Sequence, residues 1–273
     1  MKFFKNKGTC SLLCLVGFLY WQNNGLTLTQ TTYSKKVPKG FDGYKILQVS
    51  DLQNKRFGQN QERILEKIRN AAPDIIVITG DLIDRNRTNL DSAMVFVEGA
   101  VNIAPIYYVS GNHEHQSGYF EELSEQLTEA GVTVLDNGKS VLQKNGDTIA
   151  LIGLADKRVN PYYQAVLSTL TKGREEDTFQ ILLSHRPELF ETYVESGVNL
   201  VFTGHAHGGQ IRLPFLGGIF APNQGFFPTY TSGLYEKKDT GMIVSRGLGN
   251  STFPFRIFNR PELVMVTLSC ENI

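Results

Sequence analysis

Residues 75–81, Ile-Ile-Val-Ile-Thr-Gly-Asp, form an apolar run that leads directly into a glycine and an aspartate. An apolar run that does not alternate with polar residues is expected for a strand buried on both faces, as in a parallel sheet. Residues 106–109 repeat this pattern, and residues 61–72 carry apolar side chains at helical spacing. Strands that alternate with helices predict an α/β fold with a mostly parallel sheet.

The chain beyond this unit is richer in strands. Residues 132–153 have the pattern of short strands joined by glycine-containing turns, and residues 181–183 and 200–202 have that of further buried strands. Residues 211–268 contain many glycines and prolines and show little helical periodicity. This strand-rich C-terminal part predicts a second sheet.

Composition excludes several classes of protein. The chain has 273 residues, of which 41% are hydrophobic and 20% charged, so it is an ordinary globular sequence rather than a disordered or fibrous one. Its 27 basic and 27 acidic residues cancel, which argues against a general nucleic-acid-binding protein or a nuclease. Three cysteines do not make a disulfide framework.

The N-terminus is predicted to be a targeting segment. Lysines at positions 2, 5 and 7 precede an apolar run from Cys10 to Trp21, which as a helix is roughly 18 Å long, shorter than the ~30 Å hydrocarbon core of a bilayer. We therefore divide the chain into a signal-anchor or signal-peptide segment with its linker, 1–39, and one domain, 40–273. The leading lysines favour an orientation with the N-terminus inside and the domain on the outer face of a membrane, and cleavage of the leader would give a secreted form.

Each predicted strand ends directly in polar, chemically versatile side chains. These side chains are Asp51 and Gln53, Asp81, Asn112 with His113 and Glu114, His185, and His205 with His207. Ligands bind at the carboxyl ends of the strands in an open α/β sheet, so the five ends are expected to converge on one rim. All five histidines of the chain lie in or beside these motifs. Carboxylate, amide and imidazole groups together suit Mn, Fe or Zn.

These motifs resemble those of the calcineurin-like metallophosphoesterase superfamily. The matching motifs, in chain order, are Ser50-Asp51-Leu52-Gln53, Thr79-Gly80-Asp81, Gly111-Asn112-His113-Glu114, Ser184-His185 and Gly204-His205-Ala206-His207. Residues 204–214 (GHAHGGQIRLP), 225–228, 245–249 and 258–262 are similar to a narrower branch, the bacterial YkuE/YaeI-type membrane-associated phosphodiesterases. The resemblance implies a four-layer α/β/β/α sandwich with two mixed sheets.

The resemblance also implies two divalent metal ions, with Mn favoured, that share the carboxylate of Asp81. By this correspondence Asp51, Gln53 and His207 complete one site. Asn112, His185 and His205 complete the other. Two such ions hold a phosphate and generate a hydroxide from water at neutral pH. His113 is the expected catalytic residue, assisting the leaving group or stabilising developing charge.

Gln53 departs from the family pattern, which usually has a histidine at this position. A neutral amide oxygen coordinates less tightly than an imidazole nitrogen and favours harder ions such as Mn. Two hypotheses follow. The first is a metal-dependent phosphoesterase acting on a phosphodiester or pyrophosphate. The second is a catalytically weakened, membrane-associated protein that binds a phosphorylated ligand.

The substrate is not fixed by any residue. Residues 214–235 contain many aromatic side chains and form either a loop packed on the core or an apolar lid for a lipid-linked or cell-envelope substrate. Family resemblance raises UDP-2,3-diacylglucosamine hydrolysis as one specific activity. Arg212 and Arg246 are candidate phosphate-binding residues, with a solvated surface role as the alternative.

Overall fold

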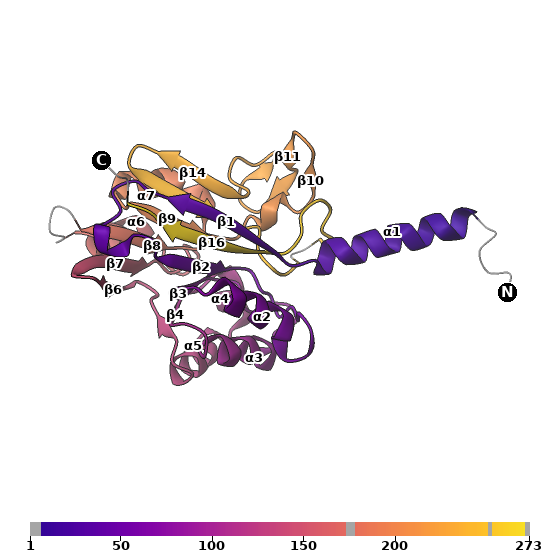
Figure 1. The fold of residues 1–273 in the computed structure, drawn as a ribbon, viewed down its shortest axis with the longest axis horizontal. Coiled ribbons are helices and arrows are strands. Elements are labelled where there is room, and N and C mark those ends of the chain that lie inside the picture. Colours follow the sequence, from indigo (N-terminus) through magenta and orange to yellow (C-terminus); the bar gives the residue numbers. More distant parts are fainter. Residues whose placement is uncertain (1–6, 173–177, 251–252, 271–273) are drawn as a thin grey trace.

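A computed structural model describes residues 7–172, 178–250 and 253–270, in which two six-stranded sheets stack face to face between layers of helices (Figure 1). The first sheet has the order β1-β16-β2-β3-β4-β5. Its strands are β1 (Thr27–Tyr33), β16 (Glu262–Leu268), β2 (Lys45–Val49), β3 (Ile75–Thr79), β4 (Ile106–Val109) and β5 (Thr133–Val134). Strands β2 to β5 are parallel, and β16 pairs antiparallel with β2.

The second sheet has the order β14-β15-β9-β8-β7-β6. Its strands are β6 (Gly138–Lys144), β7 (Asp147–Gly153), β8 (Phe179–Leu183), β9 (Leu200–Thr203), β14 (Gly233–Lys237) and β15 (Thr240–Val244). The four central strands are parallel, and β6 and β14 pair antiparallel at the two edges. Both sheets are therefore mixed, as the family resemblance implied.

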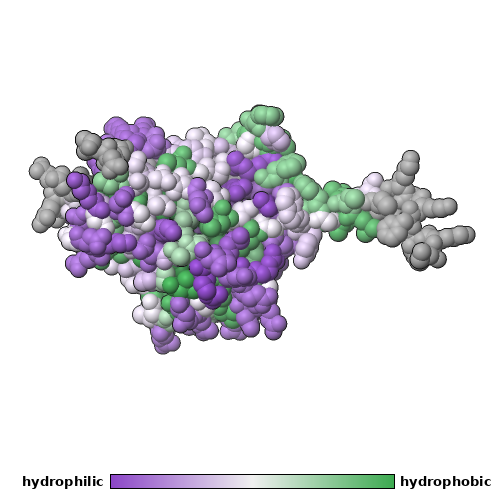
Figure 2. Space-filling model, viewed as in Figure 1, coloured by the Kyte–Doolittle hydropathy of each residue, from purple (hydrophilic) through white to green (hydrophobic). Residues whose placement is uncertain are grey.

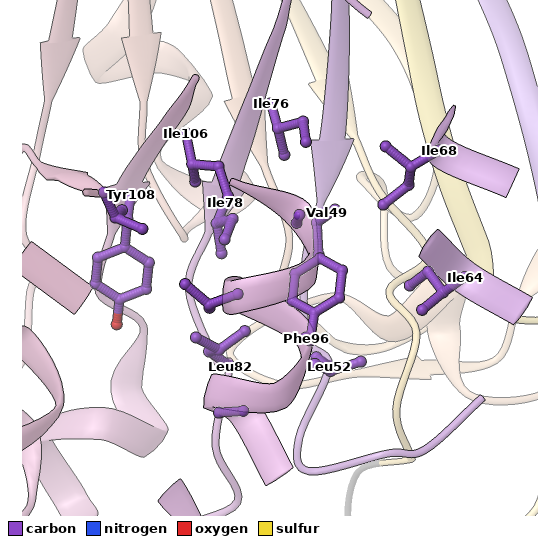
Figure 3. Packing of buried hydrophobic residues seen from close by; sticks show 14 of the residues in the cluster. Val49, Leu52, Ile64, Ile68, Ile76, Ile78, Leu82, Phe96, Ile106 and Tyr108 are labelled. Carbon is purple, nitrogen blue, oxygen red and sulfur yellow. The ribbon is translucent and has the colours of Figure 1, made fainter. Parts of the chain in front are cut away.

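Helices cover the outer face of each sheet. They are α2 (Glu62–Ala71), α3 (Leu90–Ala100), α4 (Asn112–Ser117) and α5 (Phe120–Glu129) beside the first sheet, and α6 (Tyr163–Thr171) and α7 (Phe190–Ser196) beside the second. Figure 3 shows how Ile64 and Ile68 of α2 and Phe96 of α3 pack beneath the strands. A second apolar cluster fills the space between the sheets, and a third lies beneath α6 and α7. The predicted four-layer sandwich is confirmed.

The sheets draw on different parts of the chain from those the sequence suggested. The second sheet was expected from the C-terminal third, but four of its strands, β6 to β9, precede residue 204. The last strand, β16, returns instead to the first sheet. Residues 27–33, within the segment assigned to the leader and linker, form β1, which pairs parallel with β16 along its whole length. Ordered structure of the first sheet thus begins before residue 40.

Helix α1 (Lys7–Asn24) projects from the body of the molecule, and its C-terminal end contacts the loop before β16 (Figure 1). Phe18 packs edge-on against Phe258, and the Arg260 guanidinium lies over the Trp21 ring. Within the described residues, no helix combines the length and the apolar character that crossing a bilayer requires.

Candidate metal centre

The carboxyl ends of five strands meet at one place in the molecule. Asp51 and Asp81 follow β2 and β3, and Asn112 follows β4, all in the first sheet, whereas His185 and His205 follow β8 and β9 in the second. The predicted convergence is therefore observed, but across the edges of two stacked sheets rather than along one open sheet. Stacking brings residues more than 100 positions apart within contact distance, as the bond between His205 N and Asp51 Oδ2 at 3.1 Å shows.

Two groups of buried side chains can each hold a metal ion. Asp81, His185 and His205 form one group, and Asp51, Asp81 and His207 form the other. In each group the candidate ligand atoms lie within 4.8 Å of one another. Asp81 belongs to both groups, the arrangement that the family resemblance implied for a carboxylate shared by two ions.

The backbone at these positions adopts a conformation that most residues avoid. Asp51, Gln53, Asp81, His205 and His207 all have a positive φ, between 46° and 61°. Left-handed backbone costs a residue with a side chain on the order of 1 kcal/mol or more, and it persists where surrounding structure enforces it. Five such residues in one cluster indicate that the strand-end loops are shaped to aim side chains at a common point.

Two glycines make room for the carboxylates. A Cβ at Gly111 would overlap Asp81 Oδ1, and one at Gly204 would overlap both Ser50 Oγ and Asp51 Oδ2. Ser50 Oγ donates to Asp51 Oδ2 at 2.6 Å, and the backbone N–H of His113 donates to Asp81 Oδ1 at 2.8 Å. These bonds fix the orientation of both carboxylates, as expected for metal ligands that need outer support.

Two imidazoles lie next to Asp81 and face one another. Nδ1 of His185 lies 2.8 Å from the carbonyl oxygen of Thr79, so Nδ1 carries a proton, and Nε2 faces Asp81 Oδ2 at 3.3 Å. Nε2 of His205 lies 2.9 Å from Asn223 Oδ1 and 2.7 Å from Arg186 Nη1. His205 Nδ1 lies 3.1 Å from His185 Nε2, which places both nitrogens and Asp81 within reach of one cation.

Amide oxygens complete the candidate ligand set. Gln53 Oε1 and Asn112 Oδ1 are buried and have no hydrogen-bond partner among the described residues. The Gln53 amide nitrogen lies 3.3 Å from both Asp81 Oδ2 and His207 Nε2. A 180° rotation of the amide exchanges its nitrogen and oxygen, which directs Oε1 toward the same two atoms. Buried polar atoms without partners are costly, so these oxygens, the carboxylates and the imidazoles together fit two divalent cations.

Electrostatics at the centre follow from burial and close charges. Burial lowers the pKa of His207 to about 4, outweighing the opposite effect of Asp51. Burial also holds the pKa of His205 well below its usual range, aided by His185. The pKa of His185 is raised to about 10, because the adjacent Asp81 overcomes the effect of burial. His205 and His207 are therefore neutral at neutral pH and available to bind metal. His185 is protonated, so a metal ion binds to it only by displacing a proton.

His113 lines the cavity beside the two groups rather than joining either of them. Its Nδ1 accepts a hydrogen bond from the backbone N–H of Arg85 at 3.2 Å, so the neutral ring carries its proton on Nε2. That nitrogen is 3.8 Å from Asp81 Oδ2. His113 is thus placed to donate a hydrogen bond or a proton at the centre, the role that the resemblance implied.

The two neighbouring residues have structural roles. The buried Glu114 carboxylate accepts bonds from the backbone N–H groups of Asp81 and Gly111, at 3.0 and 2.8 Å, and so supports both strand-end loops. His115 lies 2.7 Å from Ser110 Oγ and packs against Phe120. Neither side chain belongs to the two ligand groups.

The cavity contains functional candidates that sequence reasoning did not identify. Its volume is about 270 Å³, and its lining includes Arg85, Arg158, Arg186, Pro222 and Asn223. Arg186 is only 2% exposed, and its guanidinium donates to both oxygens of Asp156, at 2.5 and 3.0 Å. Its Nη1 also lies 2.7 Å from His205 Nε2. Arg186 directly follows the candidate ligand His185, and this position was the sequence signal that could have identified it. No local pattern marks Asp156 or Asn223 as partners of Arg186.

The arginines chosen from sequence lie elsewhere. Arg246 pairs with Glu262 at 2.8 Å, and Arg212 donates to the carbonyl oxygen of Gly208 at 2.9 Å. Neither residue lines the cavity. Their observed contacts stabilise the C-terminal loops, so the phosphate-binding role suggested for them is not supported by their positions.

Comparison with known proteins agrees with this geometry. The chain is 36% identical over 254 residues to the metallophosphoesterase YkuE of Bacillus subtilis, with 90% of this chain and 86% of that protein covered. It is 28% identical over 231 residues to the phosphodiesterase YaeI of Escherichia coli, with 82% of each chain covered. Among solved structures, TT1561 of Thermus thermophilus has a TM-score of 0.50 at 12% identity, covering 75% of this chain and 90% of that one. This last likeness concerns the fold alone.

The sequence profile of the calcineurin-like phosphoesterases matches residues 44–209, which is more than half of the chain and includes every candidate ligand described above. The chain therefore belongs to the calcineurin-like metallophosphoesterases, a family of metal-dependent phosphoric ester hydrolases.

Proposed function

We propose that the protein hydrolyses a phosphodiester or pyrophosphate bond at a centre of two divalent cations. The observation that carries the proposal is the sharing of Asp81 between two buried ligand groups. Asp51, Gln53 and His207 hold one cation with Asp81. Asn112, His185 and His205 hold the other. Bound cations supply positive charge to the phosphate and lower the pKa of a water molecule.

The protein's own groups bind the substrate and manage protons around this centre. His113 presents its Nε2 proton to the cavity, where it stabilises charge on the phosphate or protonates the departing oxygen. Arg85, Arg158 and Arg186 line the same cavity and favour an anionic substrate. The bond pair from Arg186 to Asp156 holds that guanidinium in place, which reduces the entropy lost when substrate binds.

A lipid-linked or cell-envelope phosphate is the proposed substrate class. Pro222 and Asn223 line the cavity and lie in the turn between β12 (Phe220–Ala221) and β13 (Gly225–Phe226). On the same hairpin, Phe220 and Phe226 stack edge to face and are both exposed. A phosphate held in the cavity would thus carry its apolar substituent toward an aromatic surface. UDP-2,3-diacylglucosamine has this chemistry and belongs in the substrate panel.

Metal dependence tests the proposed function. Protein stripped by chelator and dialysed is expected to turn over no bis-p-nitrophenyl phosphate, and Mn is expected to restore activity as binding approaches two ions per chain. Elemental analysis measures the metal, and absorbance measures p-nitrophenolate. Two bound ions without turnover of this or any panel substrate would instead favour the phospho-ligand-binding alternative.

Location is a separate part of the proposal. We propose a bacterial membrane-associated protein, attached through its N-terminal segment, with the catalytic domain on the outer face; the Lys-rich start of the chain supports this orientation. Membrane fractions from intact cells treated with protease test it. A domain protected from protease until the cells are lysed would contradict the proposed side.

Replacing Gln53 with histidine tests its place in the centre. Gln53→His is expected to lower the Mn concentration for half-maximal activity by about threefold to tenfold, because imidazole binds such ions more tightly than an amide oxygen. The position has φ +48°, and histidine is among the residues that tolerate positive φ. A metal titration of turnover at fixed pH measures the change, and coincident curves for an active wild type would remove Gln53 from the ligand set.

A further inference from the structure

Exposed apolar side chains are concentrated at one end of the molecule. Helix α1 exposes Leu12, Leu13, Leu15, Val16, Tyr20 and Trp21, and the C-terminal loops expose Leu213, Phe215, Leu216, Phe220, Phe226, Phe227, Phe253, Phe255 and Phe258. Elsewhere in the described part of the chain, the exposed large apolar side chains are Tyr119, Val141, Val159 and Tyr162. Figure 2 shows green, apolar atoms along α1 and on the lobe that carries β10 (Arg212–Leu213) and β11 (Gly217–Gly218).

These segments are joined to one another by direct contacts. Phe18 of α1 packs against Phe258, and the neighbouring residue Ile257 accepts a backbone hydrogen bond from Arg212 of β10 at 3.0 Å. Ile219 bonds in turn to the backbone of Gly209 and Ile211. Helix α1, the loop 253–260 and the hairpins β10–β11 and β12–β13 therefore form one continuous structure, which we call the aromatic end.

The charges of the aromatic end are of one sign. Helix α1, residues 209–227 and the loop 253–260 contain no aspartate or glutamate, although the whole chain has 27 acidic residues. The charged residues of these three segments are Lys7, Arg212, Arg260 and the buried Arg256. The neutral total of the chain thus conceals a local excess of cationic side chains in the segments that carry the exposed apolar ones. Exposed Phe and Trp together with Lys and Arg suit an interface rich in anionic lipid.

We infer that the aromatic end is a docking surface for an anionic lipid bilayer, contacted by the two hairpins and the loop 253–260 as well as by α1. A large exposed apolar surface marks an interaction site, and the absence of acidic residues from its segments selects the negatively charged surface of a membrane. This goes beyond the proposed chemistry, since protein without metal is expected to dock equally well.

Docking would set the catalytic centre against the membrane. Hairpin β12–β13 carries exposed Phe226 and also supplies Pro222 and Asn223 to the cavity lining. Ile219, just before this hairpin, bonds to Gly209 at the end of the segment that contains His207. The cavity would therefore open at the lipid headgroups rather than in bulk solvent.

Tryptophan fluorescence can report contact at each segment, because Trp21 is the single tryptophan of the chain. In full-length, metal-free protein, Trp21→Phe combined with Phe227→Trp places the probe on the hairpin segment. Trp21→Phe combined with Tyr162→Trp is the matched control, since Tyr162 is 77% exposed and Phe227 is 69% exposed. Vesicles are phosphatidylcholine alone or phosphatidylcholine with 30% phosphatidylglycerol.

The hairpin probe is expected to shift to shorter wavelength with the anionic vesicles and much less with phosphatidylcholine alone, whereas the control probe does not shift. In vesicle titrations, Phe215→Ser/Phe226→Ser/Phe227→Ser is expected to weaken binding by about tenfold or more. Tyr119→Ser/Val159→Ser/Tyr162→Ser is expected to bind like wild type.

Three results would overturn the inference. The first is a wild-type protein that does not bind anionic vesicles. The second is a shift at Trp21 with none at the hairpin probe, which would leave α1 as the sole contact. The third is a hairpin shift that appears without vesicles and grows with protein concentration, which would assign the surface to a second copy of the chain. Because turnover is not measured, none of these results bears on the catalytic centre.

Discussion

Asp81→Ala is expected to abolish metal binding at both positions and to reduce turnover by at least about 10⁴-fold. Asp81 is the one side chain shared by the two ligand groups, so its removal takes an anionic ligand from each cation. Typical enzymes accelerate their reactions by about 10⁶-fold or more, and most of this acceleration is expected to be lost without the metal centre. Elemental analysis and bis-p-nitrophenyl phosphate turnover, both with added Mn, measure the two effects.

Asp74→Asn is the matched control for this variant. Asp74 precedes the same strand, β3, but lies at its opposite end, where its carboxylate accepts a bond from the backbone of Lys45 at 2.8 Å. Its replacement is expected to leave metal content and turnover near wild type. Circular dichroism confirms that both variants are folded. Two bound ions and near-normal turnover in Asp81→Ala would show that the centre has been assigned wrongly.

His113→Ala is expected to retain both metal ions while turnover falls by about 10²–10⁴-fold, the range for loss of a general acid or base. The side chain lines the cavity without belonging to either ligand group, and the N–H of Arg85 holds the neutral ring with its proton on Nε2. Metal content and kcat measured on the same preparation distinguish this role from ligation. Loss of metal would make His113 a ligand.

The leaving group separates two ways in which His113 can act. If it protonates the departing oxygen, the loss is expected to be much smaller for p-nitrophenolate, which leaves readily as an anion, than for an alkyl ester. An equal loss for both esters would show that His113 stabilises charge on the phosphate instead. His115→Ala is the control, because His115 lies two positions away and packs against Ser110 and Phe120. It is expected to keep turnover within a few-fold of wild type.

The candidate ligands were accessible from sequence because the signals that place them are local. An apolar run such as 75–79 forms a buried strand, and the residue types that follow it lie at its carboxyl end. Asp51, Asp81 and His185 could therefore be placed from their position after such runs. The departure at Gln53 was also visible at this level, because it is a change of residue type within a motif.

Other features depended on contacts between distant segments. The pairing of β1 with β16 joins residues more than 200 positions apart. Strand β1 has no apolar run that would predict it, since three of its side chains are buried only in part and three are exposed. The assignment of β16 to the first sheet depends on the same pairing. No periodicity in either strand selects its partner, because partner choice is decided by how complete sheets pack.

Sequence by itself thus determined the class of fold, the chemistry of the candidate metal ligands and the family. Tertiary structure decided that the candidate ligands come from two sheets, that Arg186 is held by Asp156 beside His205, and that α1 meets the loop that carries Phe258. The physical reason is the range of the interactions. Backbone periodicity and turn chemistry act over a few residues, whereas buried ion pairs and surface patches arise only when segments far apart in the chain are packed together.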